Sequence, residues 1–170
     1  MLNAAELDAL CRNSEEDAAR LDAAFYLKRP SLDDMDNAGD VFFGARNDDD
    51  ALMGLAHLTP AQIRTFDGSE LISCVQNERE LVLQIIETFD EFRNQGAAKT
   101  MLRACFAHAA SEGKTLNLGD FTTFGDLYLK SVVREGLENY PGLLTHEMDE
   151  FETFEEWLDN DMDGVTAPHL

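Results

Sequence analysis

Six consecutive residues of this sequence have the types and the spacing to bind a phosphate group. They form a turn between an apolar segment and an amphipathic helix pattern, and they read Arg93-Asn94-Gln95-Gly96-Ala97-Ala98. A glycine turn at the start of a helix aims several backbone N–H groups at one point, and such an arrangement binds pyrophosphate. We therefore expect an anion to bind at this turn.

The charge around the turn differs from that of the chain as a whole. The protein has 34 Asp and Glu residues against 13 Lys and Arg residues, a formal net charge of −21. Between residues 93 and 114 the only acid is Glu112, and the basic residues are Arg93, Lys99, Arg103 and Lys114. The local positive charge favours an anion site. The overall charge argues against direct binding of nucleic acid, because its phosphates would be repelled.

The turn requires a strand before it and a helix after it. Residues 81–89 are apolar and partly β-branched, which predicts a buried strand in the centre of a sheet. Residues 97–111 predict a helix that ends at Gly113, with one apolar face made by Met101, Leu102, Cys105, Phe106 and Ala109. Residues 115–121 alternate apolar and polar side chains and predict a strand. Together they predict a βαβ unit with parallel strands.

A hairpin is predicted ahead of this unit. Residues 41–46 and 51–58 read as two antiparallel strands joined by a polar turn at 47–50. We expect Thr59-Pro60 to begin a connecting region, in which residues 69–75 form a short strand or helix.

Helices are predicted on both sides of the sheet-forming segments. Capping residues at Asn3 and Ser14 predict two N-terminal helices. A further amphipathic helix is predicted at 126–137, ended by Pro141-Gly142, and a strand at 143–148.

These motifs, in this order, resemble the GNAT acyltransferase superfamily. In that family a strand is followed by an acidic-aromatic-basic turn and then by Gln/Arg-x-x-Gly-x-Gly/Ala at a helix start, which here is Glu91 to Ala98. A further strand and a helix with a tyrosine in a Leu-Tyr-x-Lys setting follow, which here is Leu127 to Lys130. The similarity spans residues 41–144. It lacks the family's usual first strand and last two strands, and the stretch between Phe121 and Tyr128 is shorter than is typical of the family.

The resemblance implies both a fold and an activity. The fold is α/β (α+β), a GNAT-like mixed, mostly antiparallel central sheet flanked by helices. Residues 1–146 would form an acyl-CoA-binding domain and residues 147–170 an acidic C-terminal helix or tail. The activity is that of an N-acetyltransferase, which transfers the acetyl group of acetyl-CoA directly to an amine of a small molecule or protein.

The resemblance also implies roles for individual residues. Backbone N–H groups of Arg93, Asn94, Gln95, Gly96, Ala97 and Ala98 would bind the CoA pyrophosphate, and the strand up to Phe89 would hold the pantetheine arm. Tyr128 would protonate the departing thiolate as a general acid. Glu87 is a candidate base for the amine, with Glu80 as a second candidate.

The acidic composition keeps two non-enzymatic functions open. One is an acidic interaction or inhibitor protein built on a GNAT-like scaffold, and the other is a nucleic-acid mimic that binds a basic partner. In the acidic tail, Phe151, Phe154 and Leu158 share one helical face, which either docks on the domain or forms an interface such as a homodimer contact. A basic acceptor or partner fits each of these functions.

Other ligand classes receive little support from the sequence. Cys11, Cys74 and Cys105 lack metal-type spacing and are expected to be reduced, mostly packed thiols. Residues 159–164 match the first half of a calcium loop, but its bidentate Glu position is Leu170, so no metal is expected. Because the chain shows no membrane-spanning apolar run and no leader, we expect a cytoplasmic protein.

Overall fold

The structure is a computed structural model. It describes residues 39–119 and 123–145 (the backbone alone for 123–127), together with Glu15, Ala19, Glu156 and Leu158. In chain order, the elements with their bounds are β1 (Val41–Arg46), β2 (Leu52–Asp67), β3 (Glu70–Thr88), the short 3-10 helix η1 (Asp90–Phe92), α3 (Ala97–Ser111), β4 (Thr115–Asn117), α4 (Thr123–Asn139) and β5 (Leu144–Thr145).

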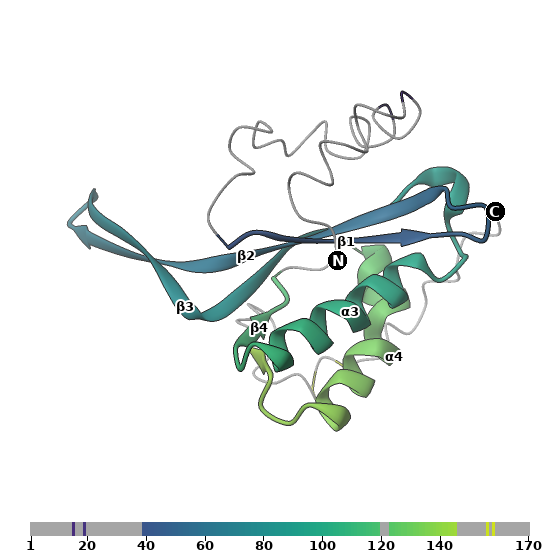
Figure 1. Cartoon of the computed structure of the whole chain (residues 1–170). Helices are drawn as coiled ribbons and strands as arrows, with labels where there is room; N and C mark the ends of the chain where they lie inside the picture. The colour runs from purple at the N-terminus through teal and green to yellow at the C-terminus, as the bar shows by residue number, and fades with distance from the viewer. Residues whose placement is uncertain are drawn as a thin grey trace.

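The five strands form one mixed sheet in the order β1-β2-β3-β4-β5. The long ladders β1–β2 and β2–β3 are antiparallel, whereas the short ladders β3–β4 and β4–β5 are parallel. Helices α3 and α4 lie side by side on one face of this sheet (Figure 1). The predicted α/β class, the central position of β3 and the βαβ unit are therefore confirmed.

The turn between β1 and β2 follows from one asparagine. The side-chain oxygen of Asn47 accepts hydrogen bonds from the backbone N–H of Asp49 at 3.1 Å and of Ala51 at 2.9 Å. Asp50 takes a left-handed conformation with φ 64°, which Asp tolerates better than most residues. The polar turn predicted at 47–50 is confirmed, and it sets the register of the first hairpin.

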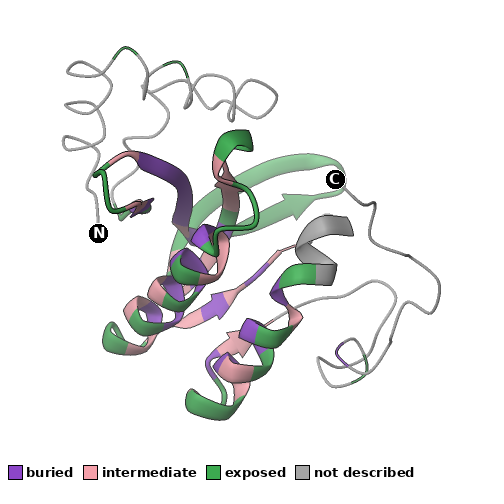
Figure 2. Cartoon of the chain, turned by 90° about the vertical axis from the view of Figure 1, so that its right-hand side faces the viewer, coloured by how far each residue is buried: buried purple, intermediate pink, exposed green. Residues whose placement is uncertain are grey.

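The core lies between the sheet and helix α3. The buried side chains of α3 are Ala97, Met101, Leu102, Cys105, Phe106 and Ala109, which include all five predicted from the helical periodicity. They pack on Phe43, Ala56, Leu58 and Leu81 of the sheet. Figure 2 shows buried and exposed residues alternating along the helices as this packing requires. Each large side chain removed from water contributes roughly 1.5–3 kcal/mol.

Helix α4 extends the same core. Leu129, Val132 and Val133 are buried in it, and Leu158 joins the cluster from outside the main described ranges. The predicted helix at 126–137 is observed as Thr123–Asn139, longer at both ends. No described helix combines the length and apolar character needed to cross a membrane.

The connecting region predicted after Thr59-Pro60 was wrong. Strand β2 continues without interruption to Asp67, and β3 begins at Glu70. Pro60 is tolerated because it lies at a register shift, where the hydrogen-bond ladder of the sheet is already irregular. The two strands therefore form a ribbon that extends well past the helices (Figure 1).

Two short strands lie at the other side of the sheet. The strand expected at 115–121 ends at Asn117, earlier than predicted. The strand expected at 143–148 is observed at Leu144–Thr145, and residues 146–148 lie outside the described part of the chain. The predicted N-terminal helices from Asn3 and Ser14, most of the acidic tail and the pattern at 159–164 lie outside the described residues.

Candidate functional site

The predicted anion-binding turn has the backbone conformation that its sequence suggests. Asn94 and Gly96 both have positive φ angles, 64° and 82°. Asparagine and glycine are the residues that adopt this left-handed conformation at the least cost. No atom lies within 4 Å of the position that a Cβ on Gly96 would occupy. Glycine is therefore favoured at position 96 by its positive φ angle and not by a steric clash.

The first turn of α3 lacks the groups that usually stabilise a helix start. The cap residue is Gly96, which has no side chain to accept a hydrogen bond, and the first turn contains no acid. Its third residue is the cation Lys99, which faces the positive end of the helix dipole. The first backbone N–H groups of a helix have no acceptor within the helix. This helix start is therefore arranged to accept an external anion.

Side chains hold the turn in place from the preceding residues. Arg93 forms an ion pair with Asp90 at 2.7 Å, and its side chain is 54% exposed. Gln95 donates from its side-chain amide to the carbonyl of Glu91 at 3.3 Å. Arg93 thus has one carboxylate partner and still offers donors to solvent.

The strand that leads to the turn has only a short ladder with β4. Only Glu80 to Val82 of β3 pair with β4, so the described ladder between these two strands ends before Gln84. Just after β4, the Asn117 side chain accepts a hydrogen bond from the N–H of Gly119 at 2.9 Å. Gly119 itself lies close to β3, since a Cβ on it would be 3.4 Å from the carbonyl oxygen of Leu83.

A β-bulge lies just beyond the end of this ladder. His57 pairs with Ile85 and Leu58 pairs with Leu83, so Gln84 is the extra residue of β3. A bulge increases local twist and redirects backbone groups, and bulges are frequent beside active sites. The sequence analysis did not identify Gln84. The available signal was one polar residue inside an apolar run.

Phe89 anchors the end of this strand to the sheet. Its side chain is buried, its N–H donates to the carbonyl of Met53 at 2.9 Å, and its carbonyl accepts from the N–H of Phe92 at 2.9 Å. Both backbone groups of Phe89 are thus engaged within the protein. The structure gives Phe89 a positioning role for the turn.

The two candidate bases on β3 lie in different surroundings. Glu87 pairs with Leu55, whereas the neighbouring pair Ile86 and Ala56 packs toward α3. Because successive strand residues point to opposite faces, Glu87 is directed to the face away from α3. Glu80 lies at the far end of the β3–β4 ladder, where its carboxylate accepts a hydrogen bond from the Thr145 hydroxyl at 2.8 Å.

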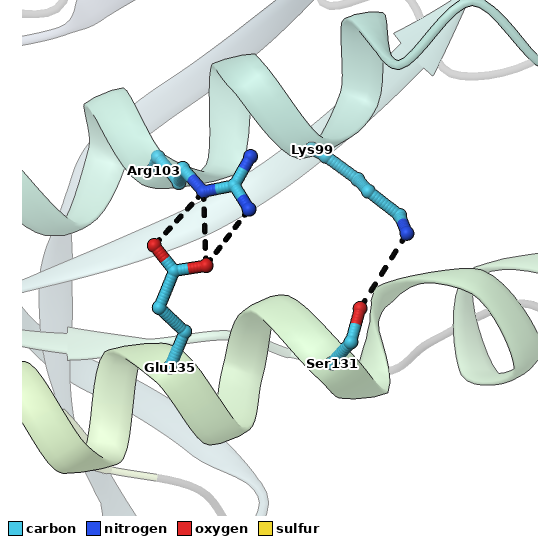
Figure 3. A network of polar contacts seen from close by, with 4 residues as sticks. All are labelled: Lys99, Arg103, Ser131 and Glu135. Atoms are coloured by element: carbon cyan, nitrogen blue, oxygen red, sulfur yellow. Dashed lines mark hydrogen bonds and ion pairs between the residues drawn. The ribbon is translucent and has the colours of Figure 1, made fainter.

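Two polar contacts between the helices define their relative position (Figure 3). Arg103 donates to both carboxylate oxygens of Glu135 at 2.8–3.0 Å, and Lys99 donates to the hydroxyl of Ser131 at 3.5 Å. Both pairs are 32 residues apart in sequence, so the helices run parallel with their starts at the same end. The hydrogen bonds from Arg103 lower the pKa of Glu135 below its ordinary value.

By the same register, Tyr128 lies at the same end of the helix pair as the predicted anion-binding turn. The offset of 32 between the contacting residues puts Tyr128 level with Gly96, one helical turn before Ser131. The side chain of Tyr128 is 46% exposed, so it does not belong to the core. Of the two predicted catalytic residues, Tyr128 is therefore at the same end of the helices as the start of α3, whereas Glu87 is on the face of the sheet away from α3.

This arrangement suits a ligand with an anionic part and an extended part. The helix start and its cations can bind a phosphate, and the backbone of β3 beyond its ladder with β4 can hydrogen-bond an extended chain. The phenol of Tyr128 can donate a proton, and the carboxylate of Glu87, on the face of the sheet away from α3, can accept one.

Comparisons with known proteins support the fold. No protein-family model matches the sequence, and no curated protein is recognisably similar to it. Among solved structures, one that is similar is an aminoglycoside acetyltransferase from an uncultured soil metagenomic sample in complex with sisomicin. That match has 12% identity and a TM-score of 0.50, and it covers 86% of this chain and 91% of the other.

Two further structures are similar at lower scores. An acetyltransferase of Trypanosoma brucei matches at 14% identity with a TM-score of 0.49, covering 86% of this chain and 92% of the other. An aminoglycoside 6'-N-acetyltransferase of Acinetobacter baumannii matches at 15% identity with a TM-score of 0.43, covering 82% of this chain and 93% of the other. Together with the element order and the mixed sheet, the match to the metagenomic enzyme shows that this chain has a divergent GNAT-like fold.

Proposed function

We propose that this protein is an acetyl-CoA-dependent N-acetyltransferase. The observation that carries the proposal is the uncapped, acid-free start of α3 at Gly96, which follows the part of β3 beyond its ladder with β4. The CoA pyrophosphate would bind the backbone N–H groups from Arg93 to Ala98, and the pantetheine arm would lie along residues 85–89 of β3. Acetyl-CoA supplies an acetyl group activated as a thioester.

The residues around this position can move the two protons of the reaction. Direct attack forms a bond between the amine nitrogen and the acetyl carbon and breaks the bond between that carbon and sulfur. Glu87 would take the proton of the amine, directly or through water, and Tyr128 would protonate the departing sulfur. Their positions on opposite faces of β3 suit an acceptor and a thiol that approach the thioester from opposite sides.

The acceptor that we favour is cationic. The net charge of −21 attracts positively charged molecules and raises their local concentration. The similar metagenomic enzyme is an aminoglycoside acetyltransferase whose structure contains sisomicin. Aminoglycosides, polyamines and lysine side chains of a basic protein are therefore the first acceptors to assay.

A titration with acetyl-CoA tests the proposal. Binding at one hundred times the dissociation constant stabilises the folded state by about 2.7 kcal/mol, which raises Tm by several degrees. We expect a concentration-dependent rise in Tm and a matching isothermal titration. An unchanged Tm at millimolar acetyl-CoA would leave the non-enzymatic alternatives, an acidic interaction protein or a nucleic-acid mimic.

A pair of charge reversals locates the site. Arg93→Glu places a carboxylate beside the expected pyrophosphate and should weaken acetyl-CoA binding by about tenfold or more. Lys114→Glu makes the same charge change beyond the opposite end of α3, roughly 25 Å away, and should change affinity less than about twofold. Equal effects of the two variants would mean that only net charge matters and that the turn is not the site.

A further inference from the structure

The β2–β3 ribbon carries an unusual surface. We call residues 61–67 of β2 and 70–77 of β3, with the turn at Gly68-Ser69, the arm. The arm extends past the helices in Figure 1 and is exposed along almost its whole length. Among the described strands, β1 pairs with β2 only as far as Leu58, and β4 pairs with β3 only from Glu80 onward, so neither ladder reaches the arm. A two-stranded ribbon of this kind is marginally stable on its own.

Apolar side chains are concentrated on the arm. Among the described residues, six large apolar side chains are exposed, and five of them belong to the arm: Ile63, Phe66, Leu71, Ile72 and Val75. Ile63 pairs directly with Val75, and Phe66 pairs directly with Leu71. These cross-strand pairs form contiguous apolar patches, and such patches on soluble proteins mark interaction sites.

The charge of the arm limits what it can bind. It contains Asp67, Glu70 and Arg64, a net charge of −1, in a chain with a net charge of −21. A strongly basic partner would find few carboxylates here. Two copies of the chain repel each other over most of their surface, and this repulsion is weakest where the arms meet.

We propose that the arm mediates dimerisation by packing against the arm of a second copy. Among the described residues, Tyr128 is the one exposed large apolar side chain that lies outside the arm. Within the part of the chain that the structure describes, a second copy therefore offers a matching apolar surface on its own arm and nowhere else. An arm-to-arm contact is also self-complementary, as a two-fold symmetric dimer requires.

The size of the arm sets the expected strength of this dimer. Residues 61–67 span roughly 24 Å, so each face of the ribbon offers about 250 Å². This area is well below the ~800 Å² per partner of a standard stable interface. We therefore expect a dissociation constant in the micromolar range.

Sedimentation velocity over a concentration series tests the proposal. The full chain is measured from about 2 to about 200 µM, a range that brackets the expected dissociation constant. Reductant is present, so that a Cys74 disulfide cannot cause association. We expect a concentration-dependent dimer that becomes tighter as salt increases, because salt screens the repulsion between the two copies.

Paired variants assign the dimer to the arm. Ile63→Ser with Val75→Ser, and separately Phe66→Ser with Leu71→Ser, should each weaken the dimer by about tenfold or more. Gln62→Ser with Gln76→Ser changes a polar pair of the same ribbon and should dimerise like the parent. All six side chains lie on the exposed ribbon, and melting curves establish that each variant is folded.

Two outcomes would overturn the proposal. One is a parent chain that stays monomeric at every concentration and salt. In that case, protection of the arm from protease would indicate that another part of the same chain covers it. The other is dimerisation of the serine variants at parental strength, which would place the interface elsewhere.

Discussion

Tyr128 is nearly half exposed although its helix packs on α3. Its position level with Gly96 depends on the spacing of the contacts Lys99–Ser131 and Arg103–Glu135. An exposed phenol at this position has no role in the core. A conservative replacement of Tyr128 therefore tests its role in catalysis, because it should have little effect on the stability of the fold.

Tyr128→Phe removes the hydroxyl and keeps the ring. We expect kcat to fall by about 10²–10⁴-fold, as is typical for loss of a general acid, with affinity for acetyl-CoA unchanged. Steady-state kinetics with the best acceptor, together with calorimetric titration of acetyl-CoA, measures both quantities. Full activity in this variant would show that another group protonates the sulfur.

The cysteines show how one residue type can lie in two environments. Cys105 is fully buried on α3, as expected, and burial raises the pKa of its thiol from 9.0 to about 12. Cys74 is exposed on the arm, so it is an exception to the expectation that the thiols are mostly packed. The reason is that β2 and β3 leave the domain together, and the sequence around Cys74 does not reveal this.

At the scale of elements, the distance between α3 and α4 depends on a glycine. A Cβ on Gly136 would lie 2.5 Å from the ring of Phe106, far inside van der Waals contact. Phe106 is itself buried against the sheet, so its ring has little room to move. The absence of a side chain at Gly136 lets α4 approach closely.

Gly136→Ala should therefore destabilise the protein. An alanine in an ordinary helix interior is about 1 kcal/mol better than glycine, but here we expect a loss of about 1–3 kcal/mol from overpacking. Urea unfolding measures the change, and Ser131→Ala on the same helix is the control with little expected effect. Phe106→Leu should partly rescue the variant. A stabilised Gly136→Ala protein would contradict the observed helix packing.

The elements differed in how well the sequence predicted them. Strand β1, helix α3 and the glycine turn were predicted at their observed positions, because each is specified by local periodicity and by a residue that ends it. The arm was not predicted, although Asp67-Gly68 is a frequent hairpin turn. Pro60 was interpreted as the end of β2, and the register shift that accommodates it depends on pairing with β3.

At the scale of the whole molecule, the buried thiol links stability to pH. Between pH 9 and pH 12 the unfolded chain releases the proton of Cys105 while the folded chain retains it. The folded state therefore binds more protons, and stability falls as pH rises through this range.

Removal of this thiol should flatten the pH dependence. Between pH 8 and pH 10.5 the parent should lose about 2 kcal/mol more unfolding free energy than Cys105→Ala. Urea unfolding at the two pH values measures this difference. Cys74→Ala removes the exposed thiol and is the control, and it should lose as much unfolding free energy between the two pH values as the parent does. Identical losses in the parent and in Cys105→Ala would mean that Cys105 ionises normally in the folded protein.

The sequence alone determined the features that depend on neighbouring residues. Alternating and helical periodicities specify strands and helices, and Asn94 and Gly96 of the turn before α3 specify its positive φ angles. The order of these elements was sufficient to predict the GNAT-like fold. This information is local because backbone conformation and amphipathic faces arise from residues a few positions apart.

The tertiary structure decided what lies beside the turn. The ladder between β3 and β4 stops at Val82, the register of the two helices follows from contacts 32 residues apart, and the arm extends beyond the ladders that β1 and β4 form. The Arg93 turn, which the sequence presents as a local anion motif, is therefore interpreted as one side of a candidate active site. Only the folded chain shows this, because contacts between distant segments depend on how the whole core packs.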